Sequence, residues 1–241
     1  MNIAVLFAGG VGSRMNTGSV PKQFLQIHGK PIIIHTLEHF ERHPEIDAIA
    51  IAILPEGRAE LERLVHRFDI SKVRWIVDGG ATGQQSRHNA LRAVAAGCPD
   101  DAIVLIHDGV RPLIDDELIS RNIALAKEKG NAITSSKVNE TIVVAEGDTI
   151  TSVLPRGPLY AARAPQSFRL GEILRAYDRT LAAGELDSID SATIMQQSGA
   201  QLHHIEGPAS NIKVTTGDDL HIARTFFSIV ENRELFGSGE A

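Results

Sequence analysis

The sequence predicts an α/β fold built on a doubly wound, mostly parallel, Rossmann-like sheet. Through the first half of the chain, short apolar runs alternate with amphipathic stretches, which is the pattern of βαβ units. Apolar residues make up 43% of the 241 residues and charged residues 22%, which suits a soluble domain with a sizeable core. No repeat or low-complexity linker divides the chain, so we expect a single domain over residues 1–234.

Four short runs rich in Ile, Val and Ala predict the buried strands, at residues 3–7, 48–54, 73–77 and 103–106. Helical signals lie between and after them. Pro31 suits the first turn of one helix, and Gly97 and Gly130 suit the ends of two others, over residues 84–96 and 115–129. A further helix is indicated by apolar residues repeating at i, i+3, i+4 and i+7: Leu61, Leu64, Val65 and Phe68.

The pattern changes after residue 137. Two β-prone runs, 140–145 and 149–154, flank Gly147 and predict a hairpin, which makes a protruding arm of residues 138–160. A two-stranded projection with exposed Ile and Val needs a partner surface, and a second copy of the chain is the simplest one, so we expect a homodimer. Helices over 170–181, around Ser191 and from Thr216, a strand near 202–205 and a disordered tail over 235–241 complete the prediction.

Composition also limits the function. The longest apolar run is far shorter than the roughly 20 residues that span a bilayer. The N-terminus lacks the basic region of a signal peptide, and the single cysteine, Cys98, cannot form an internal disulfide. The formal net charge is −6, whereas nucleic-acid binding favours a basic surplus. We therefore expect a cytoplasmic protein with neither a nucleic-acid nor a membrane partner.

The loop after the first strand carries the strongest chemical signal. After Ala8 the glycines Gly9, Gly10 and Gly12 let backbone N–H groups approach an anion. The same region provides two cations, Arg14 and Lys22. Met15 stands where a dinucleotide fingerprint has its third glycine, and no Walker Gly-Lys-Ser/Thr ending follows. The loop suits a nucleoside triphosphate from which pyrophosphate is released. A nicotinamide-dependent oxidoreductase and a catalytically silent nucleotide-binding subunit remain as alternatives.

Three ordered blocks resemble the signature blocks of the cytidylyltransferases that act on polyol phosphates, a family of nucleotidyltransferases. They are the glycine loop with Pro21-Lys-Gln-Phe-Leu25, then His107-Asp-Gly-Val-Arg-Pro112, and Asn211-Ile-Lys-Val-Thr215. The resemblance implies transfer of CMP from CTP to a polyol phosphate, with Mg²⁺ as cofactor. A phosphate monoester has a second pKa near 6, so at pH 7 it is already a nucleophile and needs no general base.

The resemblance also implies roles for single residues. Arg14, Lys22 and Lys213 match catalytic cations around the CTP phosphates, and Asp108 matches the acid that helps to hold Mg²⁺. The nucleotide side would include the backbone around Ala8 and Gly10 and the loop Gly79-Gly80-Ala-Thr-Gly-Gln-Gln-Ser86. On the polyol phosphate side the matching residues are Arg111, Asp190 and, donated by the arm to the partner subunit, Thr141 and Arg156.

The family has two main branches, which use 2-C-methylerythritol 4-phosphate or ribitol 5-phosphate. Methylerythritol enzymes typically read Ala-Gln-Thr-Pro-Gln where this chain has Ala162-Arg-Ala-Pro-Gln166, and place Thr where this chain has Ile189. The glycine loop, Gly79–Ser86 and Ala162–Phe168 resemble the ribitol branch. The chain is therefore expected to make CDP-ribitol for capsule or teichoic acid synthesis, with a ribulose-5-phosphate reductase as a further partner; methylerythritol 4-phosphate is the alternative acceptor.

Overall fold

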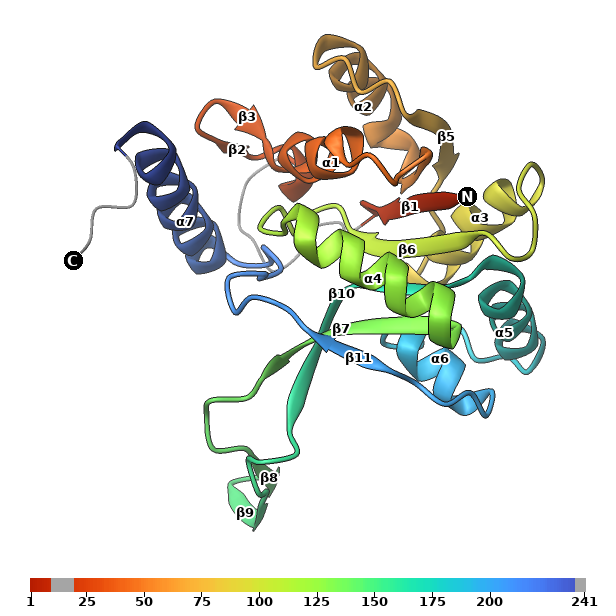
Figure 1. Cartoon of the computed structure of the whole chain (residues 1–241). Helices are drawn as coiled ribbons and strands as arrows, with labels where there is room; N and C mark the ends of the chain where they lie inside the picture. The colour runs from red at the N-terminus through yellow and green to blue at the C-terminus, as the bar shows by residue number, and fades with distance from the viewer. Residues whose placement is uncertain (10–19, 237–241) are drawn as a thin grey trace.

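The computed structural model describes residues 1–9 and 20–236, and its centre is a seven-stranded sheet. The strands lie in the order β11-β7-β10-β6-β1-β4-β5 (Figure 1). Their bounds are β1 (Asn2–Phe7), β4 (Ala48–Ile53), β5 (Val73–Asp78), β6 (Ile103–Asp108), β7 (Asn131–Lys137), β10 (Tyr160–Arg169) and β11 (His204–Glu206). All neighbouring pairs are parallel except those of β10, which runs antiparallel to β6 and β7. The predicted mostly parallel, doubly wound sheet is confirmed.

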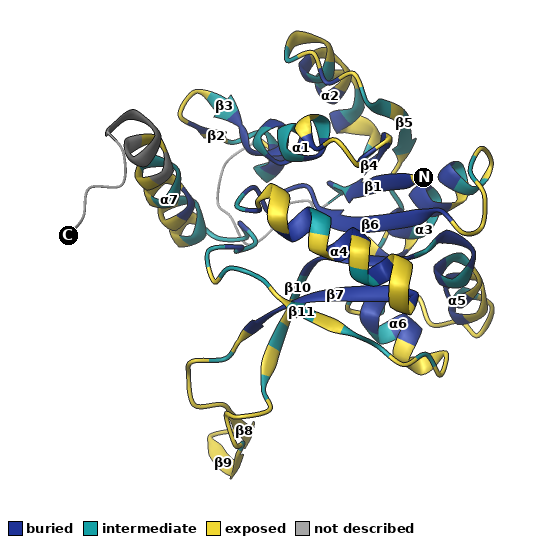
Figure 2. Ribbon diagram, viewed as in Figure 1, coloured by how far each residue is buried: buried dark blue, intermediate teal, exposed yellow. Residues whose placement is uncertain are grey.

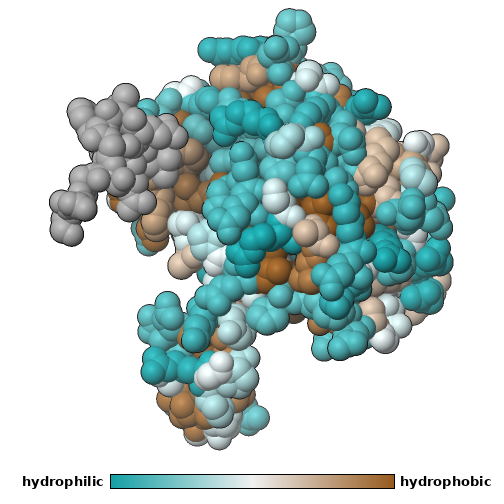
Figure 3. All heavy atoms as spheres, viewed as in Figure 1, coloured by the Kyte–Doolittle hydropathy of each residue, from teal (hydrophilic) through white to brown (hydrophobic). Residues whose placement is uncertain are grey.

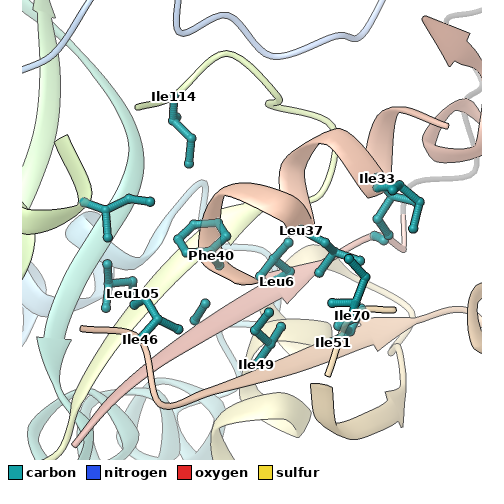
Figure 4. Packing of buried hydrophobic residues seen from close by; sticks show 14 of the residues in the cluster. Leu6, Ile33, Leu37, Phe40, Ile46, Ile49, Ile51, Ile70, Leu105 and Ile114 are labelled. Carbon is teal, nitrogen blue, oxygen red and sulfur yellow. The ribbon is translucent and has the colours of Figure 1, made fainter. Parts of the chain in front are cut away.

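Six helices cover the two faces of the sheet. On one face lie α1 (Ile32–Arg42), α2 (Pro55–Arg67) and α4 (Asp116–Lys129), and on the other lie α3 (Gly83–Ala95), α5 (Leu170–Ala182) and α6 (Ser191–Gln197). An apolar cluster lies between the sheet and the helices on each face. Successive residues of a strand point to opposite faces, so Leu6 of β1 packs in one cluster and Val5 in the other. Figure 4 shows Leu6 with Leu37 and Phe40 of α1 in the first cluster.

Capping contacts confirm the predicted ends of α4 and the predicted start of the last helix, whereas α3 (Gly83–Ala95) is capped by Ala96, one residue before Gly97, and Pro31 directly precedes α1. Asp115 accepts a hydrogen bond from the Leu118 N–H at 2.7 Å and so caps α4, whose other end is Gly130 at φ +88°. The last helix, α7 (Gly217–Phe236), begins with a reciprocal capping box between Thr216 and Asp219. It continues through Phe236, into the segment predicted to be disordered, and residues 237–241 lie outside the described residues.

The sequence prediction missed several elements. The strands β7 and β10 are central to the sheet, yet their residues were not assigned to any strand. A short 3-10 helix, η1 (Lys22–Phe24), and a small antiparallel pair, β2 (Gln26–Ile27) and β3 (Lys30–Pro31), were also not predicted; they lie between the loop predicted up to Pro21 and the helix predicted from Pro31.

The predicted hairpin arm is present between β7 and β10. It is formed by β8 (Val143–Glu146) and β9 (Thr149–Val153), joined through Gly147 at φ +62°. The arm projects from the body in Figure 1 and is exposed along its length in Figure 2. Apolar side chains gather on it in Figure 3, and the exposed ones are Ile142, Val143, Val144, Ile150 and Val153. Among the described residues, no helix is both long and apolar enough to cross a membrane.

Candidate active site

The candidate site lies at the carboxyl ends of β1 and β6, the edge where ligands bind in open α/β sheets. The two strands end side by side, with Phe7 opposite Asp108. Beyond β1 the chain turns through Ala8 and Gly9, and the Ala8 N–H donates to the Ala52 carbonyl at 2.8 Å. The following residues of the glycine loop, including Gly10, Gly12 and Arg14, lie outside the described residues, so their predicted roles stay predictions.

The hydroxyl of Ser86 holds the loop after β5 together and lies against the first loop at Gly9. It accepts a hydrogen bond from the Gly80 N–H and donates one to the Thr82 carbonyl, both at 3.0 Å. A Cβ at Gly9 or at Gly79 would lie 3.2 Å from this oxygen, a tight contact on each side. The two glycines therefore let both loops close around Ser86, and the structure brings these predicted nucleotide-binding residues together.

Asp108 is the electrostatic centre of the site. Its side chain is 8% exposed, and it accepts from the Lys213 ammonium at 2.6 Å and from the Arg111 Nε at 3.2 Å. Burial alone would raise the pKa of Asp108, but the charges of Arg111 and Lys213 outweigh burial and hold the pKa well below its ordinary value. Asp108 is therefore ionised at neutral pH, and residues predicted from two distant blocks meet here.

The backbone carbonyl of Asn211 accepts hydrogen bonds from Arg111 and from a second arginine, Arg163. Arg111 donates to the Asn211 carbonyl at 2.8 Å, and Arg163 reaches the same oxygen at 3.5 Å while its Nε donates to Ser136 Oγ at 3.0 Å. Beneath them, His107 Nε2 lies 3.0 Å from the Arg111 carbonyl. Burial lowers the pKa of His107 to about 4, so this imidazole is neutral at pH 7 and supports the loop.

Asp190 lies on another wall of the site, at the start of α6. Its carboxylate caps that helix by accepting from the Thr193 N–H at 2.9 Å, and it also accepts from the Gln166 amide at 2.8 Å. The other end of the same amide accepts from the Ala192 N–H at 2.9 Å. Gln166 on β10 thus fixes the position of Asp190 relative to the sheet.

Two adjoining cavities share Phe7, Arg87, Asp108, Ile189 and Lys213. The first, here called the nucleotide cavity, adds the residues of the glycine and Ser86 loops. These are Ala8, Gly9, Lys22, Gln23, Gly83, Ser86, Val110, Asp187 and Ser188. The second, here called the acceptor cavity, extends toward β10 and α6. It adds Ile106, Arg111, Ala162, Arg163, Ala164, Gln166, Asp190 and Ser191. The predicted nucleotide and acceptor residues are thus separated into neighbouring spaces with Asp108 and Lys213 between them.

Thr141 and Arg156 do not line either cavity. Both are exposed on the arm, where Arg156 donates to the Asn139 carbonyl at 2.9 Å. Within one chain the arm projects away from the site, as Figure 1 shows. Their predicted role in a partner subunit's site therefore stays a prediction.

The sequence prediction did not include Arg87 or Gln166 among the site residues. Arg87 is 4% exposed; its Nε donates to the Tyr177 hydroxyl at 2.7 Å, and its Nη2 donates to the Ser188 carbonyl at 3.1 Å. Its guanidinium carbon lies 5.1 Å from the centre of the Phe7 ring. The sequence signal that could have identified Arg87 is its position on the apolar face of the predicted helix, three residues before Ala90 and four before Leu91.

Comparisons with known proteins identify relatives across nearly the whole chain. A family model described as IspD, 2-C-methyl-D-erythritol 4-phosphate cytidylyltransferase, matches residues 2–228. A ribitol-5-phosphate cytidylyltransferase of Streptococcus agalactiae serotype III is 45% identical over 98% of this chain and 100% of the relative. A protein of the same name in Vibrio parahaemolyticus is 41% identical, over 98% of this chain and 100% of its own length.

A 2-C-methyl-D-erythritol 4-phosphate cytidylyltransferase of Geotalea uraniireducens is 38% identical over 95% of this chain and 97% of the relative. Among solved structures, the 4-diphosphocytidyl-2C-methyl-D-erythritol synthase of Anaerococcus prevotii superposes with a TM-score of 0.80 at 25% identity. That superposition covers 94% of this chain and 96% of the other. These similarities contradict the alternatives of a nicotinamide-dependent oxidoreductase and a silent subunit.

Proposed function

The chain belongs to the IspD family of CTP-dependent cytidylyltransferases, and from that premise we propose that its acceptor is ribitol 5-phosphate. An oxygen of the acceptor phosphate attacks the α-phosphorus of CTP. The bond from that phosphorus to the bridging oxygen of the β-phosphate breaks. The products are CDP-ribitol and pyrophosphate.

One observation carries the choice of acceptor. Of the four positions at which this chain departs from the usual methylerythritol pattern, three line the acceptor cavity, namely Arg163, Ala164 and Ile189; the fourth, Gly83, which is often Arg in those enzymes, lines the nucleotide cavity. Differences scattered over the surface would not bear on substrate choice. Differences gathered in one cavity change its shape and charge where the polyol lies. The higher identity to relatives named for ribitol 5-phosphate supports the same acceptor.

In the proposed mechanism the chain contributes charge and position. Lys213 lies between the two cavities and stabilises negative charge at the α-phosphorus, and Lys22 acts on the nucleotide side. Asp108 holds Lys213 in place through their 2.6 Å contact. The acceptor phosphate carries its own charge at pH 7, so no base has to remove a proton, and the buried neutral His107 is not needed as one.

Asp108 also fits the Mg²⁺ ion that the family implies. Each carboxylate oxygen accepts one hydrogen bond from a cation and keeps another lone pair. Within the described part of the chain, no group of three or more His, Cys, Asp or Glu side chains could hold an ion. One carboxylate suits Mg²⁺, which proteins often bind through one or two carboxylates together with substrate phosphates. When bound, the ion would withdraw negative charge from the phosphate groups.

The arm supports a further part of the proposal, a homodimer in the cytoplasm. Its exposed Ile and Val side chains project away from the body, where a second copy of the chain would cover them (Figure 3). In such a dimer Thr141 and Arg156 would reach the partner's acceptor cavity. A reductase acting on ribulose 5-phosphate would supply the acceptor.

Pyrophosphate release tests the proposed acceptor directly. The protein is incubated with CTP and Mg²⁺, and ribitol 5-phosphate and 2-C-methyl-D-erythritol 4-phosphate are offered in parallel. We expect release with ribitol 5-phosphate and little with the other acceptor. Release with the methylerythritol compound alone would assign the chain to the other branch. Release with neither would refute both acceptors.

A further inference from the structure

The acceptor cavity carries more positive charge than its acids neutralise. Among the described residues that line it, two carboxylates, Asp108 and Asp190, face four cationic side chains: Arg87, Arg111, Arg163 and Lys213. The formal surplus is two positive charges. A phosphate monoester at pH 7 carries a charge of about −1.5 to −2, so the surplus matches a single such group.

The surplus can be assigned to particular residues. Arg111 and Lys213 both contact Asp108, and Asp190 is held by neutral groups at the start of α6. Arg87 and Arg163 have only neutral hydrogen-bond partners, and neither forms an ion pair with an acid anywhere in residues 1–9 and 20–236. Arg111 and Lys213 share the single charge of Asp108, whereas these two guanidiniums are the cations of the cavity that contact no acid in the described residues.

Burial makes this arrangement costly without an anion. Arg87 is 4% exposed, and transfer of an unpaired charge out of water is strongly unfavourable. Arg163 is half-buried beside Arg111, whose like charge, together with burial, lowers the pKa of Arg163. Proteins keep buried charges when these are paired, and an anion that pairs with both arginines has room in the acceptor cavity, which both of them line.

Hydrogen bonds to neutral groups hold both side chains in place. Arg87, on α3, donates hydrogen bonds to Tyr177 and Ser188. Arg163, on β10, donates one to Ser136. Each guanidinium has five N–H donors, of which these contacts use only part. Arginine binds phosphate oxygens through pairs of parallel hydrogen bonds, which lysine cannot form.

We propose that Arg87 and Arg163 together bind the phosphate dianion of the acceptor and select for a phosphorylated substrate. This inference rests on the proposed transfer to a polyol phosphate and assigns the part of the acceptor that these residues recognise. Lys213 remains with Asp108 at the boundary between the cavities, beside the α-phosphate, and Arg111 contacts the same acid from the acceptor cavity.

The first test is kinetic. Arg163→Gln removes the charge from a half-buried side chain, and Arg163→Lys keeps the charge but loses the planar donors. We expect the KM for ribitol 5-phosphate to rise at least about tenfold in the Gln variant, and less in the Lys variant, with the KM for CTP unchanged. Arg87→Lys should raise the same KM. An equal rise in the KM for CTP, or no change in either KM, would overturn the proposal.

The matched control is Arg92→Gln. Arg92 lies on the same helix as Arg87, but its side chain is 63% exposed and contacts Asp178 at 3.5 Å. It should leave both KM values unchanged. Free ribitol provides a second comparison, because it lacks the phosphate. If it inhibits the unmodified protein and loses that inhibition in Arg163→Gln, the arginine recognises the polyol hydroxyls and the proposal is wrong.

A binding measurement separates this inference from the proposed function. Inorganic phosphate is titrated calorimetrically into the full-length chain with CMP present to occupy the nucleotide cavity. Binding that weakens at least about tenfold in Arg163→Gln, but not in Arg92→Gln, supports the arginine site even if ribitol 5-phosphate gives no turnover. Equal phosphate binding by all three proteins, with normal turnover of ribitol 5-phosphate, would overturn the arginine site and leave the proposed function standing.

Discussion

Replacing Lys213 by methionine removes the cation between the two cavities and keeps most of its volume. In the structure its ammonium lies 2.6 Å from Asp108, with side chains 40% and 8% exposed. At an effective dielectric constant of about 20, unit charges at this distance attract by about 6 kcal/mol, most of which desolvation offsets. Arg111 still neutralises Asp108 in the variant, so we expect a loss of only about 1–2 kcal/mol in unfolding free energy.

The catalytic effect of Lys213→Met should be much larger than its effect on stability. Removal of one preorganised group that stabilises transition-state charge typically lowers kcat by about 10²–10³. For a chain of this length, the stability loss corresponds to a fall in Tm of about 2–8 °C. Both quantities are measurable on one preparation, by pyrophosphate release at saturating substrates and by thermal unfolding.

The control for this variant is Lys127→Met, which removes a surface lysine with a 52% exposed side chain, 3.6 Å from Glu45. It should change neither kcat nor Tm appreciably. A kcat unchanged in Lys213→Met, in a folded protein, would refute the argument that this cation stabilises charge at the α-phosphorus. A loss of kcat accompanied by unfolding at the assay temperature would make the effect structural.

Four further predictions address other parts of the molecule. Because the pKa of Asp108 is lowered in the folded state, its contribution to stability is complete above about pH 4 and is lost as the pH falls further. In Asp108→Asn the unfolding free energy, measured by urea unfolding at a series of pH values, should fall less steeply below about pH 4. Ser86→Ala should raise the KM for CTP by up to about tenfold, because the Gly80 N–H loses its partner and the loop after β5 becomes less fixed. The double substitution Ile150→Asp and Val153→Asp should yield a monomer by light scattering, and a monomeric unmodified protein would refute the dimer. Asn122→Ala should lower the unfolding free energy by about 2–4 kcal/mol, since two buried strand hydroxyls lose their partner.

The sequence predicted the apolar strands well and missed the polar ones. β4, with its Ala-Ile alternation, is buried throughout and was predicted within a residue of its bounds. β7 and β10 are equally central but contain Thr, Ser, Gln and a proline, residues that typically indicate loops. Asn122 of α4 makes their burial possible, because it accepts from Ser167 Oγ and donates to Thr134 Oγ1. A tertiary contact of this kind has no local pattern in the sequence.

In the site, the identities of several residues could be predicted from the sequence, but their contacts could not. Asp108, Arg111 and Lys213 come from blocks far apart in the sequence, and the resemblance to a family assigned them before any geometry could. Their mutual contacts, and the sharing of the Asn211 carbonyl between Arg111 and Arg163, depend on how β6, β10 and the segment before α7 come together. Residue types and spacing carry no information on such distances.

Arg87 is a different case, because the sequence did contain its signal. Ala90, Leu91 and Val94 follow it at i+3, i+4 and i+7, so Arg87 occupies the apolar stripe of α3 that packs on the sheet, and all four residues are buried. Arg92, five positions later, lies off that stripe and is exposed. A charged residue in an apolar stripe has to be paired or face a cavity, and the N-terminal part of a helix that follows a parallel strand lies near the ligand-binding edge. Helical phase together with strand order therefore indicates a buried cation near the ligand-binding edge at position 87, without reference to any family.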